Sequence, residues 1–277
     1  MGGAKRSRSA QAVAAERAVL TDLGAIDDPF AERMLDPAMA RILWGVRHLL
    51  PGSLRRRSVT LAGLAARVRF HDAQVVAALD DGIDQVVVLG AGYDSRVWRL
   101  ARPGVRCFEL DHPLTQEDKR RSAPPGGPTY VAADLRSDSA VEALVAGGLD
   151  VGCSVVLVLE GVTMYLPEEV VRRQLRSLAD ACAAGSRLST DFYPPADAGT
   201  AGNQRQNRLQ QLARRGSGEG LHLTVSRSDA EALVASCGWS VTAAVGARAA
   251  ARALVPAAAG LPVDAVNDHK TLLAARR

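Results

Sequence analysis

The chain has 277 residues, of which 47% are hydrophobic and 23% charged, as in an average soluble globular protein. Its 34 Lys and Arg side chains exceed the 30 Asp and Glu by only four, and they lack the dense basic stripe of a nucleic-acid binder. No stretch approaches ~18 uninterrupted apolar residues, which excludes a membrane span on length. The four cysteines lie far apart, so neither a disulfide framework nor a metal site is expected, and a reduced cytoplasmic protein is the simplest interpretation.

Helical patterns predominate in the first 82 residues. Residues 1–10 are basic and are interpreted as a disordered tail. The spacing of apolar residues then predicts helices over 11–23, 31–50, 54–66 and 73–79. Pro29 suits a first helical turn, and Pro51 with Gly52 ends the second helix. These features predict an N-terminal helical extension over 1–82.

After residue 82, short apolar runs alternate with helical segments. The runs at 85–89 and 154–159 are rich in valine and nearly all apolar, as expected of strands buried on both faces. Further strands are predicted over 105–110, 129–132, 187–192, 239–245 and 271–275, and helices over 95–100, 114–121, 139–146, 168–184 and 228–237. This alternation predicts an open α/β sheet made of βαβ units.

A polar stretch over 195–225 separates the fifth predicted strand from the remaining elements, with helical potential only near 203–214. It is interpreted as an insertion within an α/β core that spans residues 83–277. No internal repeat is visible, and the whole chain is expected to form one structural domain.

A glycine-rich turn directly follows the first predicted strand. Gly90, Ala91 and Gly92 stand between that strand and a helix, where backbone N–H groups can approach a ligand closely. The second predicted strand ends with Asp111, about 20 residues beyond the glycines, at the position from which an acidic side chain binds ribose hydroxyls. The combination indicates a nucleotide-containing cofactor.

Two cofactor classes share this arrangement, namely the nicotinamide or flavin dinucleotides and S-adenosylmethionine (SAM). A dinucleotide site has a third glycine in G-x-G-x-x-G, but this chain has Ser95 there, next to Asp94. A carboxylate at Asp94 would repel a pyrophosphate, whereas the methionine ammonium group of SAM would tolerate it. Asp134, after the third strand, can accept a hydrogen bond from an adenine amino group. These residues favour SAM over a nicotinamide cofactor.

Several motifs, in order, resemble the leucine carboxyl methyltransferase family, and most closely its bacterial polyketide O-methyltransferase branch. They are D-D-P-F-A from Asp27, A-R-V-R-F from Ala66, L-G-A-G-Y-D-S-R from Leu89, F-E-L-D-H-P from Phe108, A-D-L from Ala133 and L-E-G-V-T-M-Y-L from Leu159. The resemblance covers nearly the whole chain. It implies a class I SAM-dependent methyltransferase fold, which is Rossmann-like with a mainly parallel seven-stranded sheet. The N-terminal helices and the insertion would form a lid over the acceptor.

The resemblance also implies a set of site residues. Arg17 and Arg67 match residues that hold the SAM carboxylate, although the pattern leaves open whether Arg67 or Arg69 points inward. Glu160 would face the methionine amino group. The remaining expected residues are Gly90 and Gly92 with Ala91 between them at the methionine moiety, Asp111 at the ribose, Asp134 and Leu135 at the adenine, and Tyr165 near the methyl-transfer site.

These features predict a SAM-dependent O-methyltransferase that acts on a polyketide-like small molecule, with a carboxylate as the favoured acceptor. A carboxylate has a pKa near ~4, so it is ionised at neutral pH and needs no general base. A phenol or other hydroxyl would benefit from a base, for which His222 is the candidate. Methylation of a protein C-terminus and a SAM-binding cyclase or scaffold are the alternatives.

Overall fold

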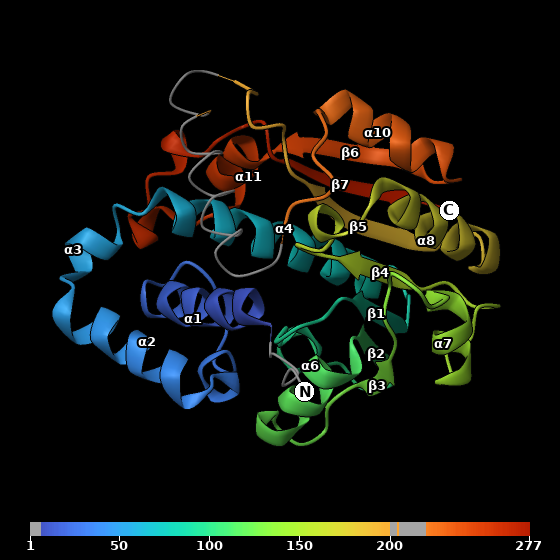
Figure 1. Cartoon of the computed structure of the whole chain (residues 1–277), viewed down its shortest axis with the longest axis horizontal. Coiled ribbons are helices and arrows are strands. Elements are labelled where there is room, and N and C mark those ends of the chain that lie inside the picture. The colour runs from blue at the N-terminus through green and yellow to red at the C-terminus, as the bar shows by residue number, and fades with distance from the viewer. Residues whose placement is uncertain (1–6, 200–203, 205–219) are drawn as a thin grey trace.

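A single seven-stranded sheet organises the computed structural model, which describes residues 7–199, 204 and 220–277. The strand order is β3-β2-β1-β4-β5-β7-β6, and β7 runs antiparallel to both of its neighbours while the other strands are mutually parallel (Figure 1). The strands are β1 (Gln85–Leu89), β2 (Arg106–Asp111), β3 (Thr129–Ala132), β4 (Val156–Leu159), β5 (Arg187–Phe192), β6 (Ser240–Gly246) and β7 (Thr271–Arg276). This confirms the predicted α/β class and its mainly parallel seven-stranded sheet.

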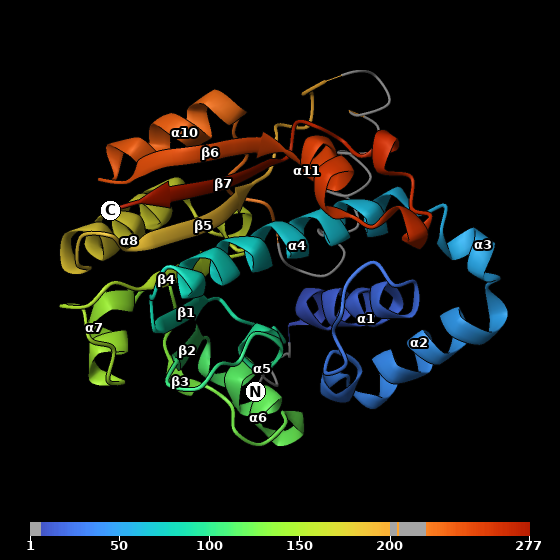
Figure 2. The same cartoon turned by 180° about the vertical axis from the view of Figure 1, so that it is seen from behind.

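Helices cover both faces of the sheet. The side chains of a strand alternate between its two faces, so the apolar strands have buried side chains on each face. Val87 and Leu157 point into a core shared with α7 (Ala140–Ala146), α8 (Glu168–Ala181) and α10 (Arg227–Ser236). Val86 and Val158 pack instead against α4 (Val59–Asp80) on the opposite face. Figure 1 shows α8 in front of the strands, and Figure 2 shows α4 in front of them. Both faces are therefore buried, as their valine-rich sequences predict.

The N-terminal helices lie beside the sheet, at the end of the molecule marked blue in Figure 1. They are α1 (Arg8–Asp22), the short 3-10 helix η1 (Glu32–Met34), α2 (Pro37–Leu49) and α3 (Gly52–Arg55). The prediction of a tail over 1–10 is wrong for its last residues. Helix α1 already begins at Arg8, because the Ser7 hydroxyl caps it by accepting a hydrogen bond from the Ala10 N–H at 3.3 Å.

The helix predicted over 31–50 is also broken. It divides into η1 and α2, because Asp36 caps α2 by accepting from the Met39 N–H at 2.8 Å and Pro37 opens the first turn. Conversely, the helices predicted over 54–66 and 73–79 are replaced by α3 and the single 22-residue helix α4. Polar Arg67 and His71 interrupt the apolar pattern of α4, yet both are buried there.

Other elements were missed or lie beyond the described chain. The alanine-rich helix α11 (Ala247–Leu254) packs against α4 and was not predicted, because alanine gives little contrast between buried and exposed faces. Most of the 195–225 insertion, including the helix predicted near 203–214, falls outside the described residues. Within residues 7–199, 204 and 220–277, no helix combines the length and apolar character needed to cross a membrane.

Candidate active site

A large cavity opens at the carboxyl ends of the parallel strands, the usual place for ligands in open α/β sheets. Its volume is about 1180 Å³, above the ~300–1,000 Å³ usual for small-molecule pockets, so it has room for more than one small ligand. Its walls come from the turns after β1, β2, β3, β4 and β5, from α1 and the first half of α4, and from residues 266–270.

The cavity brings together most of the predicted site residues, namely Arg17, Arg67, Gly90, Ala91, Gly92, Asp111, Asp134, Glu160 and Tyr165. In the described part of the chain, its lining does not include Leu135 or His222. Leu135 is buried in the core beside α8, with its carbonyl accepting from Gln174 Nε2 at 2.7 Å. His222 is exposed, and its backbone N–H donates to the Met164 carbonyl at 2.8 Å.

The turn after β1 has the geometry expected of a ligand cradle. Gly90 has φ +63° and Gly92 φ +49°, a left-handed conformation that glycine adopts without strain. A Cβ on Gly90 would lie 2.5 Å from Val162 Cγ2, so a larger residue does not fit there. The Asp111 carboxylate accepts hydrogen bonds from the Gly92 N–H and, at 2.6 Å, from the His112 N–H. Burial raises the pKa of Asp111, although these backbone bonds oppose the shift.

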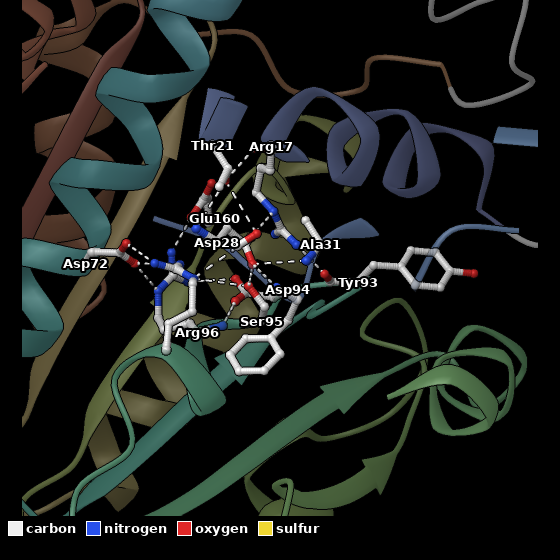
Figure 3. Close-up of polar contacts among 12 residues, drawn as sticks. Arg17, Thr21, Asp28, Ala31, Asp72, Tyr93, Asp94, Ser95, Arg96 and Glu160 are labelled. Atoms are coloured by element: carbon white, nitrogen blue, oxygen red, sulfur yellow. Dashed lines mark hydrogen bonds and ion pairs between the residues drawn. The ribbon is translucent and has the colours of Figure 1, made fainter. Parts of the chain in front are cut away.

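A buried network of charged side chains lies next to this turn (Figure 3). Its centre is Arg96, whose side chain is 1% exposed. Arg96 forms ion pairs with Asp72 at 2.9 Å, Asp94 at 2.8 Å and Glu160 at 2.6 Å, and the second oxygen of Glu160 is 2.9 Å from Arg67 Nε. Burial opposes ionisation of Glu160, but Arg96 and Arg67 outweigh it and hold its pKa well below the usual range. Glu160 is therefore a carboxylate.

The network continues to helix α1. Arg17 pairs with Asp28 at 2.9 Å and also donates to the Tyr93 carbonyl, next to the glycine turn. The other oxygen of Asp28 accepts from Ser95 Oγ at 2.7 Å. These contacts attach α1 directly to the loop after β1, as the dashed lines in Figure 3 show. Asp28 also lies 3.9 Å from Arg99. Cations and carboxylates therefore alternate from Arg17 on α1 through Asp28 to Arg99.

The structure also decides between the two arginines of the A-R-V-R-F motif. Arg67 lines the cavity. Arg69 points away from it, because its Nε donates to the Ala25 carbonyl at 2.5 Å. Arg96 and its partner Asp72 were not predicted as site residues. The only sequence signal for Arg96 was its place at the end of the L-G-A-G-Y-D-S-R motif.

A second cluster lies beyond Glu160, where β5 ends beside the start of β7. Lys270 Nζ is 3.0 Å from the Tyr193 hydroxyl and 3.2 Å from Asp191 Oδ2, and Arg67 Nη1 lies 3.5 Å from the same hydroxyl. Asp191 is buried and accepts from the Gly161 N–H at 2.6 Å. Sequence reasoning missed this cluster, because no linear motif relates residue 193 to residue 270.

Comparison with known proteins identifies the family. The profile of the family described as "Leucine carboxyl methyltransferase" matches residues 10–179, more than half of the chain. A Mycobacterium avium (strain 104) protein, described as an inferred S-adenosyl-L-methionine-dependent methyltransferase, is 33% identical over 256 residues, which cover 85% of this chain and 83% of the relative. The chain belongs to the leucine carboxyl methyltransferase family. It is a SAM-dependent methyltransferase, and SAM is its cofactor.

Solved structures show the same fold. A DUF574 family protein from Streptomyces avermitilis MA-4680 superposes with a TM-score of 0.63 at 16% identity, over 98% of each chain. A protein from Thermobifida fusca YX, described as a methyltransferase by inference, superposes with a TM-score of 0.61 at 20% identity, over 98% of this chain and 95% of the other. The expected class I methyltransferase architecture is therefore confirmed.

Proposed function

We propose that this methyltransferase transfers the methyl group to a carboxylate oxygen of a small, largely apolar acceptor such as a polyketide-like acid. The observation that carries the proposal is the composition of the cavity beyond Glu160, where the cationic Lys270, beside the Tyr193 hydroxyl, stands among apolar side chains. Apolar walls with a few converging polar groups are typical of sites that bind a small molecule in one orientation. Positive groups in such a setting favour a negatively charged acceptor.

The other half of the cavity fits SAM. The glycine turn leaves space and backbone N–H groups for the methionine moiety, and Asp111 would take the ribose hydroxyls, since a carboxylate can accept about four hydrogen bonds and two are used. Asp134 would face the adenine. Arg17 and Arg67 would receive the methionine carboxylate, and Glu160 its ammonium group. Leu135 would support the adenine site from the core rather than contact the ligand.

The proposed reaction needs alignment more than acid–base catalysis. Bound SAM supplies a methyl group that its sulfonium already activates. Transfer to a carboxylate oxygen would form an O–CH₃ bond while the S–CH₃ bond breaks with its electron pair on sulfur. The products would be a neutral methyl ester and S-adenosylhomocysteine, with no proton transferred. The protein holds the two reactants together, which alone can remove ~7–11 kcal/mol of a bimolecular barrier. Tyr165, in the turn after β4, lines the cavity and would help to position the acceptor.

A hydroxyl acceptor has less support. Among the residues that the structure describes, the only imidazole that lines the cavity is His112. Its Nδ1 accepts from the Leu114 N–H at 3.3 Å, and it follows Asp111 at the ribose end. His222, the base expected for a hydroxyl acceptor, is exposed outside the lining.

The acceptor class can be tested by product chemistry. The full-length protein is incubated with methyl-labelled SAM and a panel of carboxylic acids, each paired with the alcohol or phenol of the same skeleton. We expect labelled products only from the acids, and we expect mild base to release the label as methanol, as it does from methyl esters. Base-stable label on the hydroxyl compounds would overturn the carboxylate assignment. Asp111→Ala serves as the control for transfer that depends on bound cofactor.

A further inference from the structure

We propose that Lys270 and Tyr193 form an anion-binding subsite that holds the carboxylate of the acceptor. The proposal rests on the proposed function and deepens it by naming the groups that select an acid. Both side chains line the cavity, together with Arg67. The Lys270 ammonium group lies 3.0 Å from the Tyr193 hydroxyl and 4.3 Å from the centre of its ring, so the two groups form one compact cationic and hydrogen-bonding surface.

The sheet topology places these residues together. Strands β5 and β7 are antiparallel, and Phe192 pairs with Thr271 at the end of their ladder. The next residue on each strand, Tyr193 and Lys270, therefore occupies the following cross-strand position, at the edge of the sheet where the cavity opens. The Lys270 carbonyl also accepts from the Ala247 N–H at 2.9 Å, which fixes the backbone at the start of α11. The subsite is thus built on regular structure.

The charges of the cluster suit a ligand that is an anion on entry and neutral on exit. The Lys270 side chain is 13% exposed, and a lysine ammonium has three N–H donors. One is donated to the Tyr193 hydroxyl, and the ammonium group also forms an ion pair with Asp191, so donor capacity remains for an acceptor oxygen. Asp191, fully buried, keeps the ammonium paired when the cavity holds no anion, because an unpaired buried charge is costly.

Loss of the acceptor charge would then favour release. Methylation converts the bound carboxylate into an ester, and a neutral carbonyl accepts a weaker hydrogen bond from an ammonium group than a carboxylate does. The pairing of Lys270 with Asp191 survives this change. Arg67 is less suited to the role, because its Nε is already committed to Glu160 at 2.9 Å.

The walls around the subsite define the rest of the acceptor. They are formed by the apolar side chains of Val59 and Leu64 on α4, Ala247 on α11, Val266 in the loop before β7, and Met164 after β4. A carboxylate held at Lys270 would have its organic body against these groups. The subsite therefore predicts an amphipathic acid, in which one carboxylate is attached to an apolar chain or ring system.

Binding without turnover tests the subsite. The full-length protein is saturated with S-adenosylhomocysteine, and two acids, decanoate and 2-naphthoate, are titrated by calorimetry beside their neutral amides. We expect at least one acid to bind tenfold or more tightly than its amide. Lys270→Met should weaken that acid tenfold or more and leave the amide unchanged, whereas Lys270→Arg, which keeps the charge, should retain most of the preference. Tyr193→Phe should have a smaller effect in the same direction.

The affinity for S-adenosylhomocysteine is measured for every variant and should stay within about twofold of wild type, which shows that the fold and cofactor half are intact. Equal binding of acid and amide by the wild type, or an unchanged acid affinity in a folded Lys270→Met variant, would overturn the subsite. Label transfer to hydroxyl compounds with the acid preference intact would instead remove the carboxylate acceptor and leave the anion subsite standing.

Discussion

The cavity has a proposed cofactor half around Gly90, Gly92 and Asp111, and a proposed acceptor half around Tyr193 and Lys270. The contacts that build these two halves differ in their range along the chain. In the cofactor half, Asp111 receives the N–H of Gly92, only 19 positions away. In the acceptor half, Lys270 meets Tyr193 across 77 positions, and Arg67 meets the same hydroxyl across 126. The proposed ribose contact at Asp111 therefore depends on a local motif, whereas the proposed acceptor recognition depends on the topology of the whole sheet. We therefore expect a substitution at Lys270 to change acceptor binding without disturbing the contact between Asp111 and Gly92.

The buried charge network belongs to both halves. Glu160 contacts Arg96, which supports the glycine turn through Asp94, and also Arg67, which reaches the Tyr193 hydroxyl. Each buried arginine or lysine in the described part of the chain has a carboxylate partner, so the loss of one member would leave a buried charge with fewer partners or none. A substitution at the centre of the network, Arg96, should disturb both halves together. A substitution at the edge of the network should disturb only the half that it contacts.

The largest effect is expected from Arg96→Met at the centre of the network. The substitution takes the arginine partner from Asp94 and leaves Asp72 with Arg99 alone and Glu160 with Arg67 alone. Removal of one member of a buried ion pair costs ~3–5 kcal/mol. Urea unfolding should show a loss of this size. The matched control is Arg102→Met, whose exposed pair with Asp80 should contribute ~0–1 kcal/mol. Equal losses in the two variants would show that the network is not a structural unit.

The next effect concerns His71, which lies beneath the acceptor half with its Nδ1 2.7 Å from Ser189 Oγ. Burial lowers the pKa of this histidine to about 4, so its imidazole is neutral in the fold. Between pH 4 and ~6.5 the unfolded chain binds the extra proton, so the free energy of unfolding should fall by up to ~3 kcal/mol as pH drops through this window.

The measurement is the difference in stability between wild type and His71→Gln across pH 4–7. The difference is needed because burial raises the pKa of Glu109 to about 7, which stabilises the fold at lower pH and gives a slope of opposite sign. Wild type should lose stability relative to the variant as the pH falls. Parallel curves would mean that His71 is not kept neutral by the fold.

A smaller effect is expected in the turn of the cofactor half. Gly90→Ala meets Val162 and also strains a positive φ, so we expect a loss of ~1–3 kcal/mol in stability with a parallel loss of SAM affinity. Gly104→Ala strains the same kind of backbone, with nothing within 4 Å of its Cβ, and should cost ~1 kcal/mol without affecting SAM. Adding Val162→Ala to Gly90→Ala should recover part of the loss. Without such recovery, the clash with Val162 would not be the cause.

The two halves can also be separated by their ligands. Asp111→Ala should lower SAM affinity by ~1–3 kcal/mol, because it removes charge-assisted hydrogen bonds, while the KM of the acceptor at saturating SAM changes little. Glu117→Ala, on the exposed face of α6 (Pro113–Ser122), is the control and should leave both constants unchanged. A folded Asp111→Ala protein with wild-type SAM affinity by calorimetry would remove Asp111 from the cofactor half.

The sequence predicted most of what is local and little of what is not. All seven strands could be placed within one or two residues, because most are short runs of apolar or β-branched residues between turns. The cavity residues near the glycine turn were also found, since their motifs lie directly after strands. Arg96 and Lys270 were missed because single charged residues have no periodic signal, and only the three-dimensional pairing of α5 (Arg96–Arg99) with α4, or of β5 with β7, gives them a role.

The smallest expected effect is an absence of pH dependence in the acceptor half. A carboxylate is fully ionised above pH 6, so kcat/KM for an acid acceptor, measured at saturating SAM, should stay constant between pH 6 and 9. Saturation matters because Glu109 lies on β2 two residues before Asp111, and its titration near 7 would affect SAM binding rather than the acceptor. His222→Ala should leave the profile unchanged, because His222 is exposed outside the cavity. A rise in kcat/KM near pH 7 that disappears in this variant would instead require a hydroxyl acceptor and a histidine base, with His222 brought to the cavity in the working enzyme. The cofactor half would be unaffected by that result, because none of its contacts involves the acceptor.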